Sequence, residues 1–177
     1  SYLKLGDAVD QAKPLAGLPN LIYRDESGIH TNKDVCSEDL SKLPPPDFEG
    51  LSLEKYFVPK LILPYLATRG CYWGKCTFCT HSFIYDSHYR KENEERVAEE
   101  LGYLGKKYKT KYFTFSDEAI SPNAFDRMSK AILSQGVEMR ALGMLKFESD
   151  SVETVELFKN LYQAGFLMLC LGLESAN

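Results

Sequence analysis

The chain has 177 residues, 44% hydrophobic and 26% charged, which is enough to bury one hydrophobic core. Its net charge of −4 argues against a nucleic-acid-binding protein, which needs a basic surface. No apolar run approaches the roughly 20 residues of a membrane-spanning helix, so we expect no membrane partner. Three of the five cysteines cluster at 71–79, which is no disulfide framework and favours a reducing, cytoplasmic compartment.

The first 50 residues look unlike the rest of the chain. Residues 20–32 predict a β-hairpin, because two short strand-like runs flank the turn-forming sequence Asp-Glu-Ser-Gly at 25–28. Consecutive prolines within 43–47 favour extended polyproline II geometry, which predicts a stiff linker. We expect residues 1–50 to be a hairpin and linker, the tail of a preceding domain, and residues 51–177 to form the main domain.

From residue 61 onward, strand-like and helix-like patterns alternate. Short connections between them imply parallel strands and right-handed crossovers, so the predicted fold class is α/β with parallel βα repeats. Four strands are too few to close a barrel, so any barrel would be partial. The predicted strands are 61–66, 112–115, 137–145 and 166–171, and the predicted helices are 92–107, 122 to about 135, and 152–164, capped by Ser121 and Ser151.

Directly after the first predicted strand, Cys71, Cys76 and Cys79 follow the spacing C-x4-C-x2-C. Clustered thiolates repel one another unless a cation lies between them, which indicates a soft metal. Three kinds of site are open at this point. Zinc could take His81 as its fourth ligand, a [2Fe–2S] cluster could take Cys170, or a [4Fe–4S] cluster could leave one iron open. Cys170 lies in an apolar run that predicts a buried strand, where cysteine packs as a small hydrophobic residue.

Polar residues follow each predicted strand where that strand ends. The cysteine motif follows the first strand, residues 116–118 the second, residues 146–148 the third, and Glu174 with Ser175 the fourth. Ligands of parallel α/β proteins gather at the carboxyl ends of the strands. We therefore expect these four groups to lie at one edge of the sheet and to face one site.

The motif resembles that of the radical S-adenosylmethionine (radical SAM) superfamily. Phe78 is the aromatic residue before the last cysteine, and the sequence Arg-Gly-Cys-Tyr-Trp-Gly at 69–74 resembles the branch that carries a cobalamin-binding domain. The order of residues 17–25 and 43–48 is similar to the segment that joins the two domains there. The resemblance covers about residues 60–177. It implies part of an open (β/α) TIM-like barrel, truncated and by itself incomplete as an enzyme.

The resemblance also implies cofactors and site residues. The cysteines would hold a [4Fe–4S] cluster, S-adenosylmethionine would bind the open iron, and its reductive cleavage would give a 5′-deoxyadenosyl radical. Cobalamin would bind a domain outside this sequence, and methyl transfer is the expected type of reaction. The metal ligands would be Cys71, Cys76 and Cys79. Phe78 would lie near the adenine, and Ser116, Asp117 and Glu118 would contact the methionyl amine. Lys146 would face the carboxylate, and Glu174 and Ser175 would contact the ribose or the methionyl group.

Two hypotheses remain at the level of the sequence. One is the radical SAM enzyme acting on an unidentified small molecule or peptide, and the other is a non-catalytic iron–sulfur or zinc-binding module. In either case an open parallel sheet exposes an edge and an apolar face. We therefore expect the isolated chain to self-associate.

Overall fold

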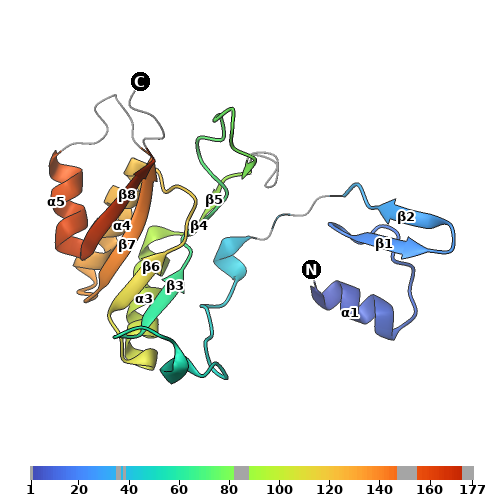
Figure 1. Ribbon diagram of the computed structural model, residues 1–177, viewed down its shortest axis with the longest axis horizontal. Helices are drawn as coiled ribbons and strands as arrows, with labels where there is room; N and C mark the ends of the chain where they lie inside the picture. Colours follow the sequence, from blue (N-terminus) through green and yellow to red (C-terminus); the bar gives the residue numbers. More distant parts are fainter. Residues whose placement is uncertain (1, 35–36, 38, 82–87, 147–154, 173–177) are drawn as a thin grey trace. The chain divides into compact units, whose positions relative to one another are not determined.

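The computed structural model describes residues 2–34, 37, 39–81, 88–146 and 155–172 (Figure 1). The chain divides into two compact units, Ser1–Asp39 and Leu40–Asn177. The assignment of residues 1–50 and 51–177 to separate domains of a longer protein stays a prediction. No described helix is long and apolar enough to cross a membrane, and the cytoplasmic location stays a prediction.

The first unit contains the hairpin that was predicted over residues 20–32. Its strands β1 (Ile22–Asp25) and β2 (Gly28–Thr31) pair antiparallel, and Gly28 has a φ of 129°, which favours glycine at the turn. The helix α1 (Tyr2–Asp10) has no counterpart among the predicted elements. The side-chain amide of Asn32 donates hydrogen bonds to the carbonyls of Leu15 and Leu18, and so fixes the end of the hairpin to the preceding loop.

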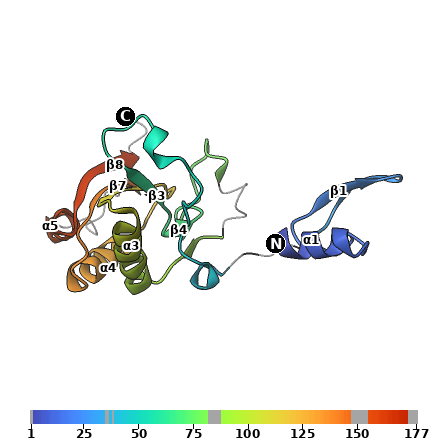
Figure 2. The same ribbon diagram turned by 90° about the horizontal axis from the view of Figure 1, so that it is seen from below.

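The second unit is a four-stranded parallel sheet with its helices on one face (Figure 2). The strands lie side by side in chain order, which confirms the predicted parallel α/β architecture. The strands are β3 (Ile62–Tyr65), β6 (Tyr112–Phe115), β7 (Arg140–Lys146) and β8 (Phe166–Gly172), the α-helices are α3 (Glu94–Tyr108), α4 (Pro122–Ser134) and α5 (Val155–Ala164), and two short 3-10 helices precede β3, η1 (Leu40–Lys42) and η2 (Leu53–Lys55). The described sheet is open, and the TIM-like barrel is not confirmed.

The helix ends follow local signals in the sequence. The Asn93 side chain accepts from the Arg96 amide and begins α3 two residues later than predicted. Ser121 caps α4 in the same way and Pro122 occupies the first helical position, as predicted. The cap that was predicted at Ser151 lies outside the described residues.

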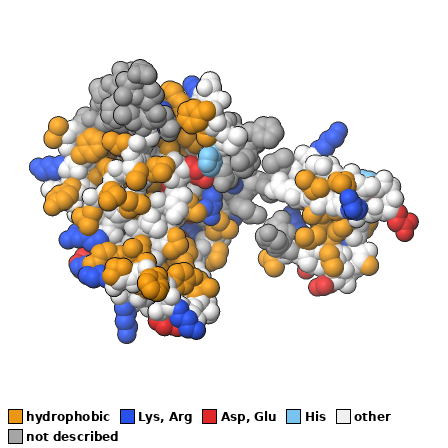
Figure 3. Space-filling view, viewed as in Figure 1, with side chains coloured by type: hydrophobic (Ala, Val, Ile, Leu, Met, Phe, Trp, Pro, Cys, Tyr) orange, Lys and Arg blue, Asp and Glu red, His pale blue; other side chains and the backbone are white. Residues whose placement is uncertain are grey.

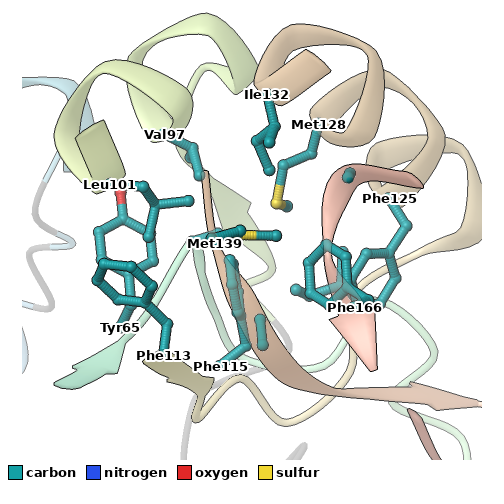
Figure 4. Packing of buried hydrophobic residues seen from close by; sticks show 14 of the residues in the cluster. Tyr65, Val97, Leu101, Phe113, Phe115, Phe125, Met128, Ile132, Met139 and Phe166 are labelled. Carbon is teal, nitrogen blue, oxygen red and sulfur yellow. The ribbon is translucent and has the colours of Figure 1, made fainter. Parts of the chain in front are cut away.

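The core lies between the sheet and the helices (Figure 4). The rings of Phe125 on α4 and Phe166 on β8 meet edge to face with centroids 5.1 Å apart. Gly143 in β7 makes this possible, because a Cβ atom there would lie 2.9 Å from Cζ of Phe125. Glycine at this position therefore lets the Phe125 ring pack directly against the strand.

Among the described residues, no helix covers the opposite face of the sheet. Ile62, Met144 and Met168 are 44%, 42% and 59% exposed, and Figure 3 shows hydrophobic side chains gathered at the surface of the second unit. Cys170 is also exposed, so its predicted burial was wrong. The reason is position, because β8 is the last strand of the described sheet and Cys170 pairs beside Met144 on the uncovered face. Self-association through this face stays a prediction.

The proline-rich stretch at 43–47 lies against α3. The guanidinium of Arg96 donates to the carbonyls of Ser41 and Leu43, and Asp47 accepts hydrogen bonds from the Tyr108 hydroxyl at 2.7 Å and from Lys107 at 3.1 Å. These contacts hold the segment before β3 against α3 within the second unit.

Candidate functional site

The cysteine motif lies on a loop whose two ends are joined. At its base, β4 (Thr68–Arg69) and β5 (Arg90–Lys91) pair antiparallel. The pairing extends one residue further from the loop, because the Glu92 amide donates to the Ala67 carbonyl at 2.8 Å. Residues 70–89, which we name the cysteine loop, are therefore closed by a two-stranded ladder at the end of β3.

The three cysteines are partly exposed and unpaired. Gly70 and Gly74 have φ values of 80° and 59°, so the loop turns sharply around Cys71. The Cys79 amide donates to the Cys76 carbonyl at 3.2 Å, which makes a tight turn between these two cysteines. In the part of the chain that the structure describes, no three potential metal ligands lie close enough together to hold an ion.

Asp117, directly after β6, points to the base of the cysteine loop. The side chain is buried, with 3% of the residue exposed. One carboxylate oxygen accepts from both the amide and the hydroxyl of Thr68 at 2.6 Å, and the other accepts from the Ala67 amide at 3.3 Å. Burial raises the pKa of Asp117 to about 6, although the hydrogen bonds from Thr68 and Ala67 act in the opposite direction.

The neighbouring residues of the same turn have different surroundings. Ser116 is exposed, and its amide donates to the Tyr65 carbonyl at 2.9 Å. The Glu118 atom Oε2 is buried and has no hydrogen-bond partner among the described residues. A buried carboxylate oxygen without a donor is unfavourable, which marks this atom as a place for a ligand donor.

Lys146, the last residue of β7, reaches the cysteine loop. Its Nζ lies 4.1 Å from the ring centroid of Trp73, and Nζ of Lys75 lies 5.2 Å from the same ring. Cations at these distances are attracted to the face of an indole. The loop after β3, the turn after β6 and the end of β7 therefore meet at one edge of the sheet, and these are three of the four groups that were predicted to lie there.

Three predicted site residues remain, Phe78, Glu174 and Ser175. Phe78 lies on the cysteine loop and is 67% exposed, and its place beside an adenine stays a prediction. Glu174 and Ser175 lie outside the described residues. The sequence reasoning missed Thr68, which is 1% exposed and donates two hydrogen bonds to Asp117.

Comparisons with protein-family models and with curated proteins found no match. Solved structures do match. The cobalamin-dependent S-adenosylmethionine radical enzyme OxsB with aqua-cobalamin bound has a TM-score of 0.80 and 18% sequence identity, covering 99% of this chain and 27% of that chain. The same enzyme with aqua-cobalamin and S-adenosylmethionine bound also gives 0.80 and 18%, covering 98% of this chain and 26% of that chain.

A second enzyme has the same arrangement. The radical S-adenosylmethionine methyltransferase TsrM from Kitasatospora setae, with cobalamin and a [4Fe–4S] cluster bound, has a TM-score of 0.62 and 16% identity over 96% of this chain and 35% of that chain. The chain thus spans about a quarter to a third of the length of these enzymes. At this level of identity the likeness concerns the fold, and the chain shares its fold with part of the cobalamin-dependent radical SAM enzymes.

Proposed function

We propose that the chain is part of a radical SAM enzyme in which Cys71, Cys76 and Cys79 hold a [4Fe–4S] cluster and S-adenosylmethionine binds beside it. The observation that carries the proposal is the contact between Lys146 and Trp73 of the cysteine loop at the carboxyl edge of a parallel sheet. The turn after β6 carries Glu118, whose buried Oε2 has no partner among the described residues. The shared fold supports the proposal, since the matching enzymes are radical SAM enzymes.

The residues present fit these groups in their chemistry. Thiolates are the usual ligands of iron–sulfur clusters, and three of them leave one iron open. The buried, unpartnered Oε2 of Glu118 can accept a hydrogen bond from an ammonium group such as the methionyl amine. Lys146, held against Trp73, supplies a positive charge for a carboxylate at the same edge. A cluster held by the three cysteines would supply the electron for the reductive cleavage of S-adenosylmethionine to methionine and a 5′-deoxyadenosyl radical.

The chain's own residues would bind and orient. The cysteine loop fixes the cluster at the edge of the sheet, Glu118 and Lys146 orient the methionyl group, and the aromatic side chains of the loop limit the access of water to sulfur. A cobalamin-dependent methyl transfer is the finer form of this proposal. Cobalamin would then bind outside these 177 residues, in the parts of such an enzyme that the chain does not span, since it covers 27% and 35% of the enzymes that share the fold.

The test is anaerobic reconstitution with iron and sulfide, followed by metal analysis and absorption spectroscopy. We expect about four irons per chain in the wild type and almost none in Cys76→Ala. Cys170→Ala is the matched control, because Cys170 is an exposed free cysteine outside the loop and should leave the iron content unchanged. Zinc at one per chain, or iron that is lost in Cys170→Ala, would overturn the proposal in favour of a zinc module or a [2Fe–2S] site.

A further inference from the structure

We propose that Asp117 is a positioning residue that anchors the base of the cysteine loop. Its two carboxylate oxygens accept three hydrogen bonds, all from Ala67 and Thr68, the two residues that lead into the loop. A buried carboxylate needs such donors, and here two of the three are backbone amides whose direction depends on the path of the chain.

This anchor holds both ends of the loop. Thr68 pairs with Lys91, Arg69 pairs with Arg90, and the Ala67 carbonyl accepts from Glu92. Fixing Ala67 and Thr68 to the turn after β6 therefore also fixes the returning strand β5. Because β3 and β6 are paired in parallel, their carboxyl ends are neighbours. The anchor therefore fixes the loop that follows β3 to the turn that follows β6.

The same contacts separate the roles of two adjacent acids. Both oxygens of Asp117 are engaged by the protein itself, whereas Oε2 of Glu118 is buried without a partner among the described residues. We therefore assign the anchor to Asp117 and the cofactor contact to Glu118. The anchor stands on the hydrogen bonds alone, and its effect on cluster binding rests on the proposed function.

Amide hydrogen exchange by NMR tests the anchor without any cofactor. In Asp117→Ala, the Ala67 and Thr68 amides lose their acceptor, and we expect their exchange to accelerate about 10- to 100-fold. In Asp117→Asn, one acceptor oxygen remains for Thr68 while an NH₂ group faces the Ala67 amide. We therefore expect faster exchange at Ala67 and a smaller change at Thr68. Glu99→Gln, which changes an exposed carboxylate on α3 to an amide, is the matched control and should leave both amides unchanged.

Unchanged exchange at both amides in a folded Asp117→Ala chain would overturn the anchor. If that variant does not fold, Asp117→Asn decides, and unchanged exchange at Ala67 would overturn it. Reconstitution with iron and sulfide then tests the consequence for the site. We expect Asp117→Asn to take up at least about threefold less iron than Glu99→Gln, and equal uptake would overturn the positioning role. A wild-type chain without a cluster would overturn the proposed function, while the exchange data would still decide the anchor.

Discussion

Two carboxylates, one in each unit, accept hydrogen bonds from similar kinds of donors, yet their pKa values are shifted in opposite directions. On the hairpin, Asp25 accepts from the amide and the hydroxyl of Ser27 at 2.8 and 2.7 Å, and from the His30 ring. At the base of the cysteine loop, Asp117 accepts from the amide and hydroxyl of Thr68 and from the Ala67 amide.

The pKa values diverge because only one site is dry. The hydrogen bonds from Ser27 and His30 lower the pKa of the exposed Asp25 to about 2, whereas burial raises the pKa of Asp117 to about 6. Hydrogen-bond donors of similar kind thus stabilise the charged carboxylate of Asp25, but only partly offset the desolvation of the Asp117 carboxylate. The contacts of Asp25 with Ser27 are local in the sequence, whereas those of Asp117 with Thr68 connect residues that are 49 positions apart.

The largest expected effect is that of removing the buried acid. In Asp117→Ala, three donors lose their acceptor in a dry site, so we expect the free energy of unfolding to fall by about 3–5 kcal/mol at pH 7. Urea unfolding followed by fluorescence reports this directly, because Trp73 is the single tryptophan and lies in the cysteine loop. Asp25→Ala should leave this transition unchanged, and an equal loss from both variants would remove the contrast between the two sites.

The next effect is the opposite pH dependence of the two sites. The folded chain keeps a proton on Asp117 between pH about 4 and 6 that the unfolded chain releases, since its folded pKa lies above the ordinary 3.8. The contribution of Asp117 to the free energy of unfolding should therefore fall by about 3 kcal/mol as the pH rises through this window, and then level off. Among the groups that face Asp117, Tyr65 and Tyr89 stay neutral because burial raises their pKa, and Glu118 adds repulsion.

Asp25 has the reverse sign. Its folded pKa lies below 3.8, so its contribution to the free energy of unfolding is present above pH 4 and is lost as the pH falls toward 2.

Unfolding curves from pH 3 to 8 for the wild type and Asp117→Asn measure how the contribution of Asp117 to the free energy of unfolding changes with pH. We expect the difference in the free energy of unfolding, wild type minus Asp117→Asn, to fall between pH 4 and 6, and a difference that is constant over this range would show that Asp117 does not titrate there.

The smallest effect is that of single hydroxyls. Thr68→Val removes one donor to Asp117 while keeping the shape of the side chain, and should reduce the free energy of unfolding by about 1–2 kcal/mol.

Ser27→Ala should instead raise the pKa of Asp25 toward its ordinary value, as measured by NMR titration, without changing the stability of the second unit. A pKa of Asp25 that does not move would show that the Ser27 hydroxyl is not the main cause.

Much of the fold was predictable because its signals are local. Short apolar runs marked the four strands, and Ser121 followed by Pro122 marked the start of α4. The burial of Cys170 was predicted wrongly, because an apolar strand reads the same whether or not both faces of the sheet are covered.

The site was predictable in its position and less so in its details. That the polar groups after β3, β6 and β7 would meet follows from parallel strands. The link from Asp117 to Thr68 spans 49 residues, and no local pattern reports it. One signal was available, because Phe113 and Phe115 are buried and Asp117 continues their alternation. That alternation identifies Asp117 as the inward-facing acid of the pair.

EPR of the reconstituted, reduced chain with and without S-adenosylmethionine tests whether the cysteine loop holds a cluster with an open iron. We expect a [4Fe–4S]⁺ signal in the wild type that shifts when S-adenosylmethionine is added, and a weaker shift in Glu118→Gln. A cluster whose signal is indifferent to S-adenosylmethionine would contradict this expectation, and the chain would then be a module that only binds metal.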